Sequence, residues 1–365
     1  MPASSRPLLA AVPALLCVLF CPSPSKSQTA QPSDTPRSQS EPSKLQLQHE
    51  VSADMSFLAD DELRGRGSAT RDEHLAALFV AARLQTLGLE PGGDTGTFLQ
   101  KIPLPNPLPN LLQKRLSKFE VIPRTETWNA IAILPGSDPA LKDEVILLTA
   151  HLDHLGVAAT PITSAKTGKP DSIFNGADDD ASGTTAVLAL AHIFANGPRP
   201  GRTIVFALFG SEEIGGFGAL AFLQHPPVPL KNIVANLEFE MIGRPDPTVP
   251  AGTLWLTGFQ RSNLGPELAK HGAHLLNDPH PTQHFFQRSD NINLARLGII
   301  AQTVSSYGLH KDYHQPSDEL STIDFRHMDN AIASMIDPIR WLCNTPWKPQ
   351  WNPGGRPAPT PPPKS

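Results

Sequence analysis

The clearest structural signal in this chain comes from three consecutive segments, EVILLTA (144–150), SGTTAVLALAHIFAN (182–196) and TIVFALF (203–209). The first and third are short runs of mainly branched apolar residues, which favours strands that are buried on both faces. The middle segment is long and apolar enough to form a helix that covers such strands. The order strand, helix, strand predicts parallel strands joined by a covering helix.

The same alternation continues on both sides of this region. Further strand-like runs are WNAIAIL (128–134), NIVANLEF (232–239), TLWLTGF (253–259) and GIIAQTV (298–304), and further helix-like runs are DEHLAALFVAARLQTL (72–87) and DNAIASMIDPIRWL (329–342). We therefore expect an α/β fold, a three-layer α/β/α sandwich around a largely parallel sheet. Ligand sites in such sheets lie just beyond the carboxyl ends of the strands. The residues that follow each strand are therefore the candidates for function.

The composition is that of a folded domain with an excess of proline. The 365 residues are 39% hydrophobic and 18% charged, which suits one large or two modest domains. The formal net charge of −5 argues against a nucleic-acid partner held by a basic face. Many of the 39 prolines lie near the two ends of the chain. These values exclude a collagen, a coiled coil, a disordered protein and a multi-span membrane protein.

The N-terminal residues 1–27 are expected to be a signal peptide. Arg6 precedes the apolar run LLAAVPALLCVLF (8–20), which is short for a bilayer span and is interrupted by Pro13. A retained anchor is the alternative interpretation. Removal of this segment predicts an exported protein, periplasmic or secreted, with no membrane span in the mature chain. Cys343 would then be its one cysteine, so no internal disulfide is expected.

The rest of the chain divides into three parts. Residues 28–48 are rich in Ser, Gln, Pro and Thr and are expected to be a flexible linker. Residues 49–343 are expected to form one domain. Residues 344–365 are rich in proline and are expected to be a disordered tail, with a spacer role favoured over partner docking.

Acidic and histidine residues follow the predicted strands one after another. They occur in the segments HLDH (151–154), NGADDDASG (175–183), GSEE (210–213), EMIG (240–243) and GLHKDYH (308–314). One such cluster alone is ordinary for a solvated turn or a helix cap. Five clusters in one α/β domain indicate a site, and a mixture of imidazoles and carboxylates is what zinc or a similar divalent ion requires.

These motifs resemble a known family, the co-catalytic di-zinc exopeptidases related to bacterial leucyl aminopeptidases, glutamate carboxypeptidase II and glutaminyl cyclases. The segments that match in order are HLDHLG (151–156), NGADDDASG (175–183), GSEEIGGFGA (210–219), NLEFEMIGR (236–244), RSDN (288–291) and GLHKDYHQPSDE (308–319). The resemblance covers nearly the whole domain. It implies an α/β/α sandwich with a mixed sheet of about eight strands.

The resemblance also implies two Zn²⁺ ions per chain. By position, His151 and Glu240 match the ligands of one ion, while Glu213 and His314 match the ligands of the other. Asp179 matches the residue that bridges the two ions. A carboxylate suits that place because each of its two oxygens can bind one cation.

Two further residues match catalytic roles in the family. Asp153 matches the carboxylate that orients the ring of His151, and Glu212 matches the general base that activates a metal-bridging water. Substrate-binding residues are less defined. Asp290 could hold a free amino group or cap a helix, and either Tyr307 or Tyr313 could donate a hydrogen bond to the oxyanion or simply pack.

The function implied by the resemblance is an exported metallopeptidase that removes N-terminal residues from peptides. The alternatives are a carboxypeptidase or dipeptidase, a glutaminyl cyclase, and a catalytically silent receptor-like relative. Glu240 stands where many aminopeptidases have aspartate and carboxypeptidases of the clan often have glutamate, and Glu238 is a less favoured substitute ligand. Larger relatives insert a protease-associated domain where this chain has only residues 101–126, which we expect to be a loop or lid.

Overall fold

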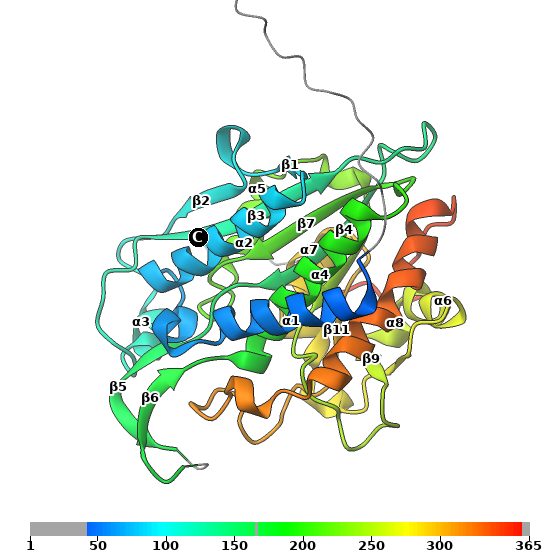
Figure 1. Cartoon of the computed structure of the whole chain (residues 1–365). Helices are drawn as coiled ribbons and strands as arrows, with labels where there is room; N and C mark the ends of the chain where they lie inside the picture. The colour runs from blue at the N-terminus through cyan, green and yellow to red at the C-terminus, as the bar shows by residue number, and fades with distance from the viewer. Residues whose placement is uncertain (1–41, 165–166, 360–365) are drawn as a thin grey trace, which may run out of the picture. The chain divides into compact units, whose positions relative to one another are not determined.

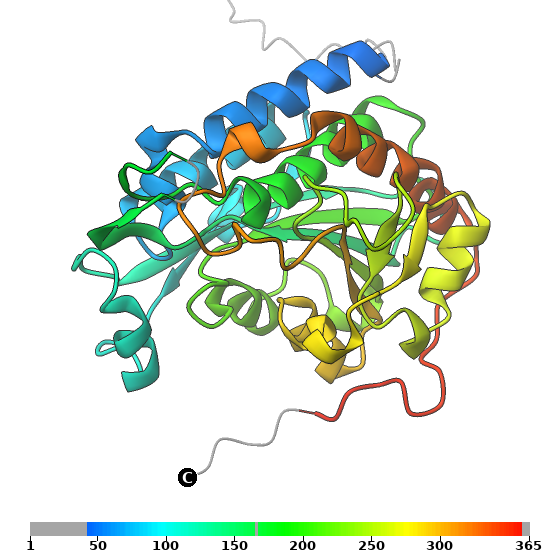
Figure 2. The ribbon, with the colours of Figure 1, turned by 90° about the horizontal axis from the view of Figure 1, so that it is seen from below.

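In the computed structural model, which describes residues 42–164 and 167–359, a mixed nine-stranded sheet lies between two layers of helices (Figures 1 and 2). The helices of this part of the chain are α1 (Lys44–Leu58), α2 (Arg71–Thr86), α3 (Asn110–Leu116), α4 (Gly183–Asn196), α5 (Phe217–Gln224), α6 (Leu264–Lys270), α7 (Asn291–Leu297) and α8 (Phe325–Asn344). Its strands are β1 (Glu90–Pro91), β2 (Leu99–Pro103), β3 (Glu126–Leu134), β4 (Val145–His151), β5 (Gly156–Thr163), β6 (Pro170–Phe174), β7 (Thr203–Phe209), β8 (Ile233–Phe239), β9 (Leu254–Leu256), β10 (Leu275–Asn277) and β11 (Ala301–Ser305). The predicted α/β/α class is confirmed.

The strand order of the large sheet is β1-β3-β7-β4-β8-β11-β9-β10, with β2 paired to β3. The four central strands, β7, β4, β8 and β11, are parallel to one another, whereas β3 and β9 are antiparallel to their neighbours. β5 and β6 form a separate antiparallel hairpin. The central parallel strands therefore direct their carboxyl ends to a single edge of the sheet.

Both faces of the central strands are covered by helices. Along β4, Ile146 and Leu148 join the core that lies under α1, α2, α4 and α8, while Val145 and Leu147 join the core under α5 and α7. All four side chains are buried. Because successive side chains of a strand point to opposite faces, such a strand can be apolar at every position. This explains why β4 and β7 could be recognised as largely apolar runs.

The folded domain begins earlier in the chain than the sequence predicts. Residues 44–48, assigned to the flexible linker, are the first turns of α1, and Ser43 Oγ caps this helix by accepting from Gln46 N–H at 3.2 Å. Val51, Met55 and Leu58 then bury one side of α1 in the core. The helix is hard to predict because its exposed residues are mostly polar. The predicted signal peptide (1–27) lies outside the described residues.

Part of the predicted disordered tail also packs on the domain. Trp351 donates from Nε1 to the carbonyl of Gly298 at 3.0 Å, and Arg202 donates to the carbonyl of Trp347 at 3.0 Å. Both tryptophans contact the main apolar core. The tryptophans supply apolar surface that the proline-rich composition conceals, so the described tail, up to residue 359, is not a free spacer at these positions.

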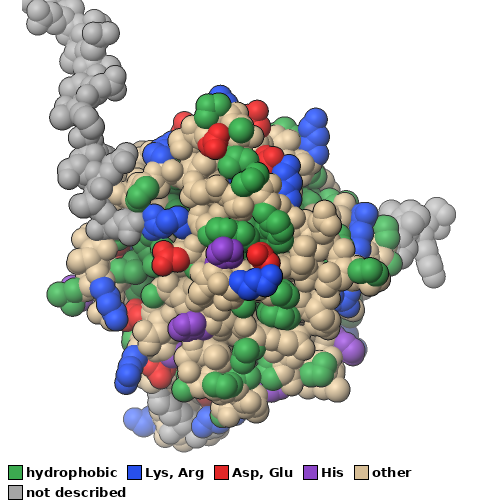
Figure 3. Space-filling model, turned by 90° about the vertical axis from the view of Figure 1, so that its right-hand side faces the viewer, with side chains coloured by type: hydrophobic (Ala, Val, Ile, Leu, Met, Phe, Trp, Pro, Cys, Tyr) green, Lys and Arg blue, Asp and Glu red, His purple; other side chains and the backbone are tan. Residues whose placement is uncertain are grey.

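Three further features of the described residues bear on the expectations for a membrane span, a disulfide and a basic surface. No helix in residues 42–164 or 167–359 is long and apolar enough to cross a membrane. Cys343 is buried and forms no disulfide. On the face shown in Figure 3, basic and acidic side chains are scattered among one another, and the described residues form no basic patch there.

Candidate metal centre

The predicted site residues come from the carboxyl ends of neighbouring strands. His151 is the last residue of β4, Glu212 and Glu213 follow β7, and Glu240 follows β8. β4 lies between β7 and β8 and is parallel to both, so these three chain segments meet at one edge of the sheet. Asp179 lies in the tight turn Ala177–Ser182 that leads into α4.

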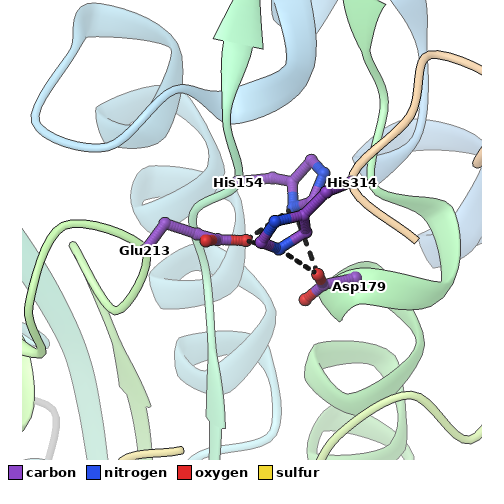
Figure 4. Close-up of side chains that lie close together, drawn as sticks. All are labelled: His154, Asp179, Glu213 and His314. Carbon is purple, nitrogen blue, oxygen red and sulfur yellow. Dashed lines mark ion pairs between the residues drawn. The ribbon is translucent and has the colours of Figure 1, made fainter. Parts of the chain in front are cut away.

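Two groups of side chains at this edge bring ligand atoms within 4.8 Å of one another. The first, the Glu240 group, consists of His151, Asp179 and Glu240. The second, the Glu213 group, consists of His154, Asp179, Glu213 and His314, and Figure 4 shows its side chains pointing toward one another. The structure thus brings together all five residues predicted as metal ligands.

Asp179 belongs to both groups and presents a different oxygen to each. Its Oδ1 lies 3.2 Å from His151 Nε2, and its Oδ2 lies 3.1 Å from His314 Nε2. Glu213 Oε1 lies 3.0 Å from the same His314 nitrogen. A carboxylate between two sets of ligands is the arrangement that bridges two cations.

His154 is a member of the Glu213 group, although from the sequence it is expected only to lie near the ligands and line the cleft. Its Nδ1 lies 3.1 Å from Glu213 Oε1 and 3.7 Å from Asp179 Oδ2, and the side chain is fully buried. Gly176 has a φ of +58°, and a Cβ atom there would lie only 2.5 Å from the His154 ring. The glycine of the NGADDDASG motif therefore makes room for this histidine.

The potential ligand atoms at this edge of the sheet suit a divalent cation. His151 Nε2, Asp179 Oδ2 and Glu213 Oε1 are buried and have no hydrogen-bond partner among the described residues. Buried polar atoms are seldom left unsatisfied in native proteins, so a ligand is expected to satisfy these. Imidazole nitrogens with carboxylate oxygens are a set that zinc binds.

Asp153 supports the site chiefly through the backbone of the neighbouring glutamates. Its carboxylate accepts from Glu212 N–H at 2.9 Å, from Glu213 N–H at 3.2 Å and from Ser68 Oγ–H at 2.5 Å. The His151 ring lies closer to the Asp153 carbonyl oxygen, 3.1 Å from Nδ1, than to its carboxylate, which is 3.8 Å away. The structure therefore places Asp153 where it fixes the positions of Glu212 and Glu213 as well as contacting His151.

A second buried aspartate, Asp180, holds three chain segments of the site together. Asp180 accepts from the backbone N–H groups of His151 at 3.2 Å, Gly183 at 2.9 Å and Met241 at 3.1 Å. These groups belong to the end of β4, the start of α4 and the segment after β8. Asp180 is thus a support of the site, since its oxygens are directed to backbone donors. Such hydrogen bonds hold ligand-bearing segments in place.

The two ligand groups differ in electrostatics. Burial raises the pKa of Glu213, but the His314 and His154 imidazoles outweigh this effect and bring it well below the ordinary range. Burial, together with the charges of Glu238 and Asp179, raises the pKa of Glu240 to about 8, against the opposing effect of His151. Without a cation, the Glu240 group is therefore less well balanced in charge than the Glu213 group.

Glu212 lines a cavity beside the Glu213 group. Burial raises its pKa well above the ordinary range, and the charges of Glu213 and Asp290 act in the same direction against His151. Its side chain belongs to neither ligand group. A free carboxylate with a raised pKa, positioned beside a metal-capable cluster, is suited to proton transfer.

The structure brings two of the candidate substrate residues, Asp290 and Tyr313, into one cavity that Tyr307 does not line. Asp290, Glu212 and Tyr313 line one cavity of about 490 Å³, and Asp290 Oδ2 is buried with no hydrogen-bond partner in the described part of the chain. Asp290 precedes α7 but makes no side-chain capping hydrogen bond to it. Gly216, with a φ of +69°, leaves room for this carboxylate, because a Cβ there would lie 2.8 Å from Asp290 Oδ1.

The two tyrosines also occupy different places. Tyr313 stacks on His314 with ring centroids 3.9 Å apart, and its hydroxyl accepts from Arg288 at 3.3 Å. Tyr307 instead lies against His310, with centroids 5.7 Å apart. Tyr313 also lines a small pocket formed by Glu240, Trp255 and Phe285, among other residues. Of the two, Tyr313 is the one positioned at the ligand groups.

Glu238 is not an alternative ligand in this geometry. Its Oε2 accepts from Asn291 N–H at 2.7 Å and from Thr303 Oγ1–H at 3.2 Å, and neither ligand group includes it. Glu240 occupies the position expected for the ligand.

A sequence model of peptidase family M28 matches residues 129–337, which is more than half of the 365 residues. The matched region contains both ligand groups. The chain belongs to peptidase family M28. This confirms the family resemblance expected from the motifs.

Curated relatives in this family include proteases and an aminopeptidase. A vacuolar membrane protease of Candida dubliniensis is 30% identical over 238 residues, which cover 62% of this chain and 22% of that protein. Leucine aminopeptidase 1 of Blastomyces gilchristii is 25% identical over 227 residues, covering 59% of this chain and 55% of that protein. The chain thus spans about half or less of the length of these relatives.

Solved structures related to this M28 chain support the fold. A zinc aminopeptidase from Bacillus subtilis aligns with a TM-score of 0.58 at 16% identity and covers 82% of this chain and 96% of that chain. A glutaminyl cyclase from Porphyromonas gingivalis aligns with a TM-score of 0.56 at 16% identity and covers 80% of this chain and 97% of that chain. At such identities the likeness shows a shared architecture only.

Proposed function

We propose that this M28 peptidase is a di-zinc aminopeptidase that hydrolyses the N-terminal peptide bond of its substrates. The observation that carries the proposal is the pair of ligand groups that share Asp179, with the free carboxylate of Glu212 next to Glu213. The zinc aminopeptidase among its structural neighbours and the leucine aminopeptidase among its relatives support this activity.

The Glu240 group and the Glu213 group would each hold one divalent cation. When bound, such cations polarise the scissile carbonyl and lower the pKa of the attacking water. Glu212 accepts the proton of that water and later delivers it to the leaving amine. Its raised pKa suits this second step, because a carboxyl that keeps its proton can act as an acid.

Asp290 favours an aminopeptidase over a carboxypeptidase. Its unsatisfied Oδ2 lines the same cavity as Glu212, so a substrate's N-terminal ammonium could donate to it beside the reacting bond. A buried carboxylate without a partner is an anion site that a positive group satisfies. A C-terminal carboxylate at the same place would be repelled.

Tyr313 is positioned to stabilise the developing oxyanion. Burial, with the charges of Asp179 and Glu213 acting in the same direction, raises the pKa of its hydroxyl, which therefore stays protonated at neutral pH. A protonated hydroxyl next to the ligand groups can donate a hydrogen bond to the carbonyl oxygen of the substrate. Arg288 contacts this hydroxyl and orients it.

The proposal also includes export of the protein. Residues 1–27 contain Arg6 and the apolar run 8–20, which is the pattern of a cleaved leader. Expression of the full chain in a bacterium, followed by N-terminal sequencing of the protein from the periplasm, tests this point. A protein recovered there with an intact residue 1 would contradict a cleaved leader.

The activity is tested with a panel of aminoacyl chromogenic amides and matched N-acetylated compounds. We expect turnover of the compounds with a free amino group, loss of turnover in a chelator, and recovery on addition of zinc. Turnover of only the N-acetylated set would contradict aminopeptidase activity. Cyclisation of N-terminal glutamine without any peptide cleavage would instead favour the glutaminyl cyclase alternative.

A further inference from the structure

A second cavity adjoins the metal centre on the side of His314. Its volume is about 560 Å³, within the ~300–1,000 Å³ range usual for small-molecule sites. Its apolar lining includes Phe119, Leu155 and Phe174, and its basic lining consists of Arg115 and Lys118. We call this cavity the Arg115 groove. The described residues that line it include no carboxylate.

The Arg115 groove is built from two segments that are joined to each other. One is the end of α3 with the loop that follows it, and the other is the β5–β6 hairpin, which lies on the same side of the molecule in Figures 1 and 2. Ala159 N–H donates to the Lys118 carbonyl at 3.0 Å, and Glu120 N–H donates to the Val157 carbonyl at 2.9 Å. Phe119 packs with Leu155, Ala158 and Phe174. The groove is therefore a formed feature of the fold and not a gap under a loose loop.

The segment that carries Arg115 is also fixed at its other end. Leu108, Leu112 and Leu116 pack against a small apolar cluster that includes Leu104 and Ile214. Ile214 directly follows Glu213 in the chain, so the short helix α3 is anchored beside the catalytic glutamates. Residues 101–126 thus form a short connection that contains α3, in place of an inserted domain, and part of it lines one wall of the Arg115 groove.

Three cavities lie next to one another across the site, because neighbouring cavities share lining residues. The cavity with Glu212 and Asp290 shares Tyr313 and Arg288 with the small aromatic pocket beside Glu240, and it shares Arg115 and His314 with the Arg115 groove. A peptide whose amino group lies at Asp290 would begin in the cavity that Glu212 and Asp290 line. The part of the substrate that leaves then extends past His314 into the Arg115 groove.

Arg115 connects the groove to the ligand set. Its Nη2 lies 2.7 Å from Glu213 Oε2, while the side chain remains 45% exposed. A guanidinium carries five N–H donors in a planar fork, so an arginine that contacts one carboxylate through Nη2 can still bind another. The exposed Lys118 adds a second positive charge to the same cavity.

We propose that the Arg115 groove binds the leaving part of the substrate and that Arg115 and Lys118 recognise the free C-terminal carboxylate of a short peptide. The inference rests on the proposed aminopeptidase function. It assigns di- and tripeptides with an apolar residue after the cleaved bond as the preferred substrate class. The apolar lining receives that residue, and the two cations bind the carboxylate that follows it. An acidic side chain offers the same chemistry, so the test separates the two sources.

The test compares three substrates, Leu-Phe, Leu-Phe-amide and Leu-Glu-amide, through the release of leucine. We expect kcat/KM for Leu-Phe to exceed that for Leu-Phe-amide by about tenfold or more, the value of one charge-assisted hydrogen bond. Arg115→Gln and Lys118→Gln should each bring this ratio toward one, mainly by raising KM for the free acid. The readout is the ratio of kcat/KM for Leu-Phe to kcat/KM for Leu-Phe-amide. Arg115 also contacts Glu213, so its replacement can lower activity in general, but such a loss affects both substrates alike and leaves the ratio unchanged.

Lys114→Gln is the matched control, because Lys114 is exposed on the same helix but does not line the Arg115 groove. It should leave the ratio unchanged. Equal kcat/KM for Leu-Phe and Leu-Phe-amide in the wild-type protein would overturn the inference while leaving the aminopeptidase function intact. A preference for Leu-Glu-amide over Leu-Phe would overturn the assignment to a C-terminal carboxylate. Release of leucine from none of the three would contradict the proposed function, and the role of the groove with it.

Discussion

The Glu240 group and the Glu213 group meet at Asp179 but are built differently. The Glu240 group has one imidazole and two carboxylates, whereas the Glu213 group has two imidazoles and two carboxylates. Glu213 also has a partner outside the ligand group, since its second carboxylate oxygen accepts a hydrogen bond from Arg115 at 2.7 Å. Glu240 follows a strand end and is only half-buried. The Glu213 group therefore offers more donors in a more fixed arrangement.

This difference implies that the two cations are not equivalent. Ligands that are already positioned cost less to organise, and additional donors raise affinity. We expect the Glu213 group to fill first and the Glu240 group to set the metal concentration at which both are occupied. The variants below test this asymmetry and the separate role of Glu212.

The largest effect on turnover is expected for Glu212→Gln. The change removes the general base but no ligand, so turnover should fall roughly 10²–10⁴-fold while both cations and the fold remain. Activity assays and elemental analysis of the purified variant check this. Near-normal turnover would show that another group moves the proton.

Glu213→Gln is expected to remove metal as well as activity. The amide is a weaker ligand than the carboxylate, so the Glu213 group should lose its cation, and excess zinc should partly restore turnover. The melting temperature should also drop, since metal bound only to the native state stabilises it. Metal content and a melting curve, measured beside Glu212→Gln, provide the comparison. Equal metal loss in both variants would mean that the roles assigned to this pair are wrong.

Glu240→Ala should reduce the metal content to nearer one ion per chain. Glu238→Gln is the matched control, because Glu238 lies two residues earlier, in β8. Its side chain accepts hydrogen bonds from Asn291 and Thr303, which an amide oxygen can still do. Glu240→Asp should keep both ions. Loss of metal from Glu238→Gln with retention in Glu240→Ala would place the ligand two residues earlier.

A smaller effect is expected for His154→Asn. The Glu213 group keeps three other ligands, so metal affinity should fall without being lost, by at least the roughly 10–100-fold seen when a residue that only supports a ligand is removed. His310→Asn serves as the control, since His310 is also buried but pairs with Asp178, 3.1 Å away, and belongs to neither group. Isothermal titration with zinc measures both. Identical affinities for the two variants would remove His154 from the ligand set.

Much of this architecture could be predicted from the sequence, because the central strands are buried on both faces. β4 and β7 appear as largely apolar runs, and the acid and histidine residues after β4, β7 and β8 mark the edge of the sheet where the carboxyl ends of these strands lie. The start of α1 and the packed tail could not be predicted in the same way. Their burial is provided by single residues such as Met55 and Trp351 within polar or proline-rich segments.

The candidate site likewise contains residues that the sequence identifies and residues that it does not. The ligands that end or follow a strand are positioned by that strand. Their place directly after a strand-like run therefore identifies them in the sequence. His154 and Arg115 act through contacts with Glu213 that depend on how a turn and a distant loop fold back. The HLDH motif could have drawn attention to His154. For Arg115, which is separated from Glu213 by 98 residues, the sequence gives no local signal.

The central claim, two unequal cation sites that share Asp179, is tested most directly by stepwise zinc addition to chelated protein. Bound zinc per chain and turnover of a leucine amide are followed together. The structure predicts two binding phases that end at two ions in the wild-type protein, with the weaker phase missing in Glu240→Ala. Saturation of the wild-type protein at one ion, or full turnover with no metal bound, would contradict the account.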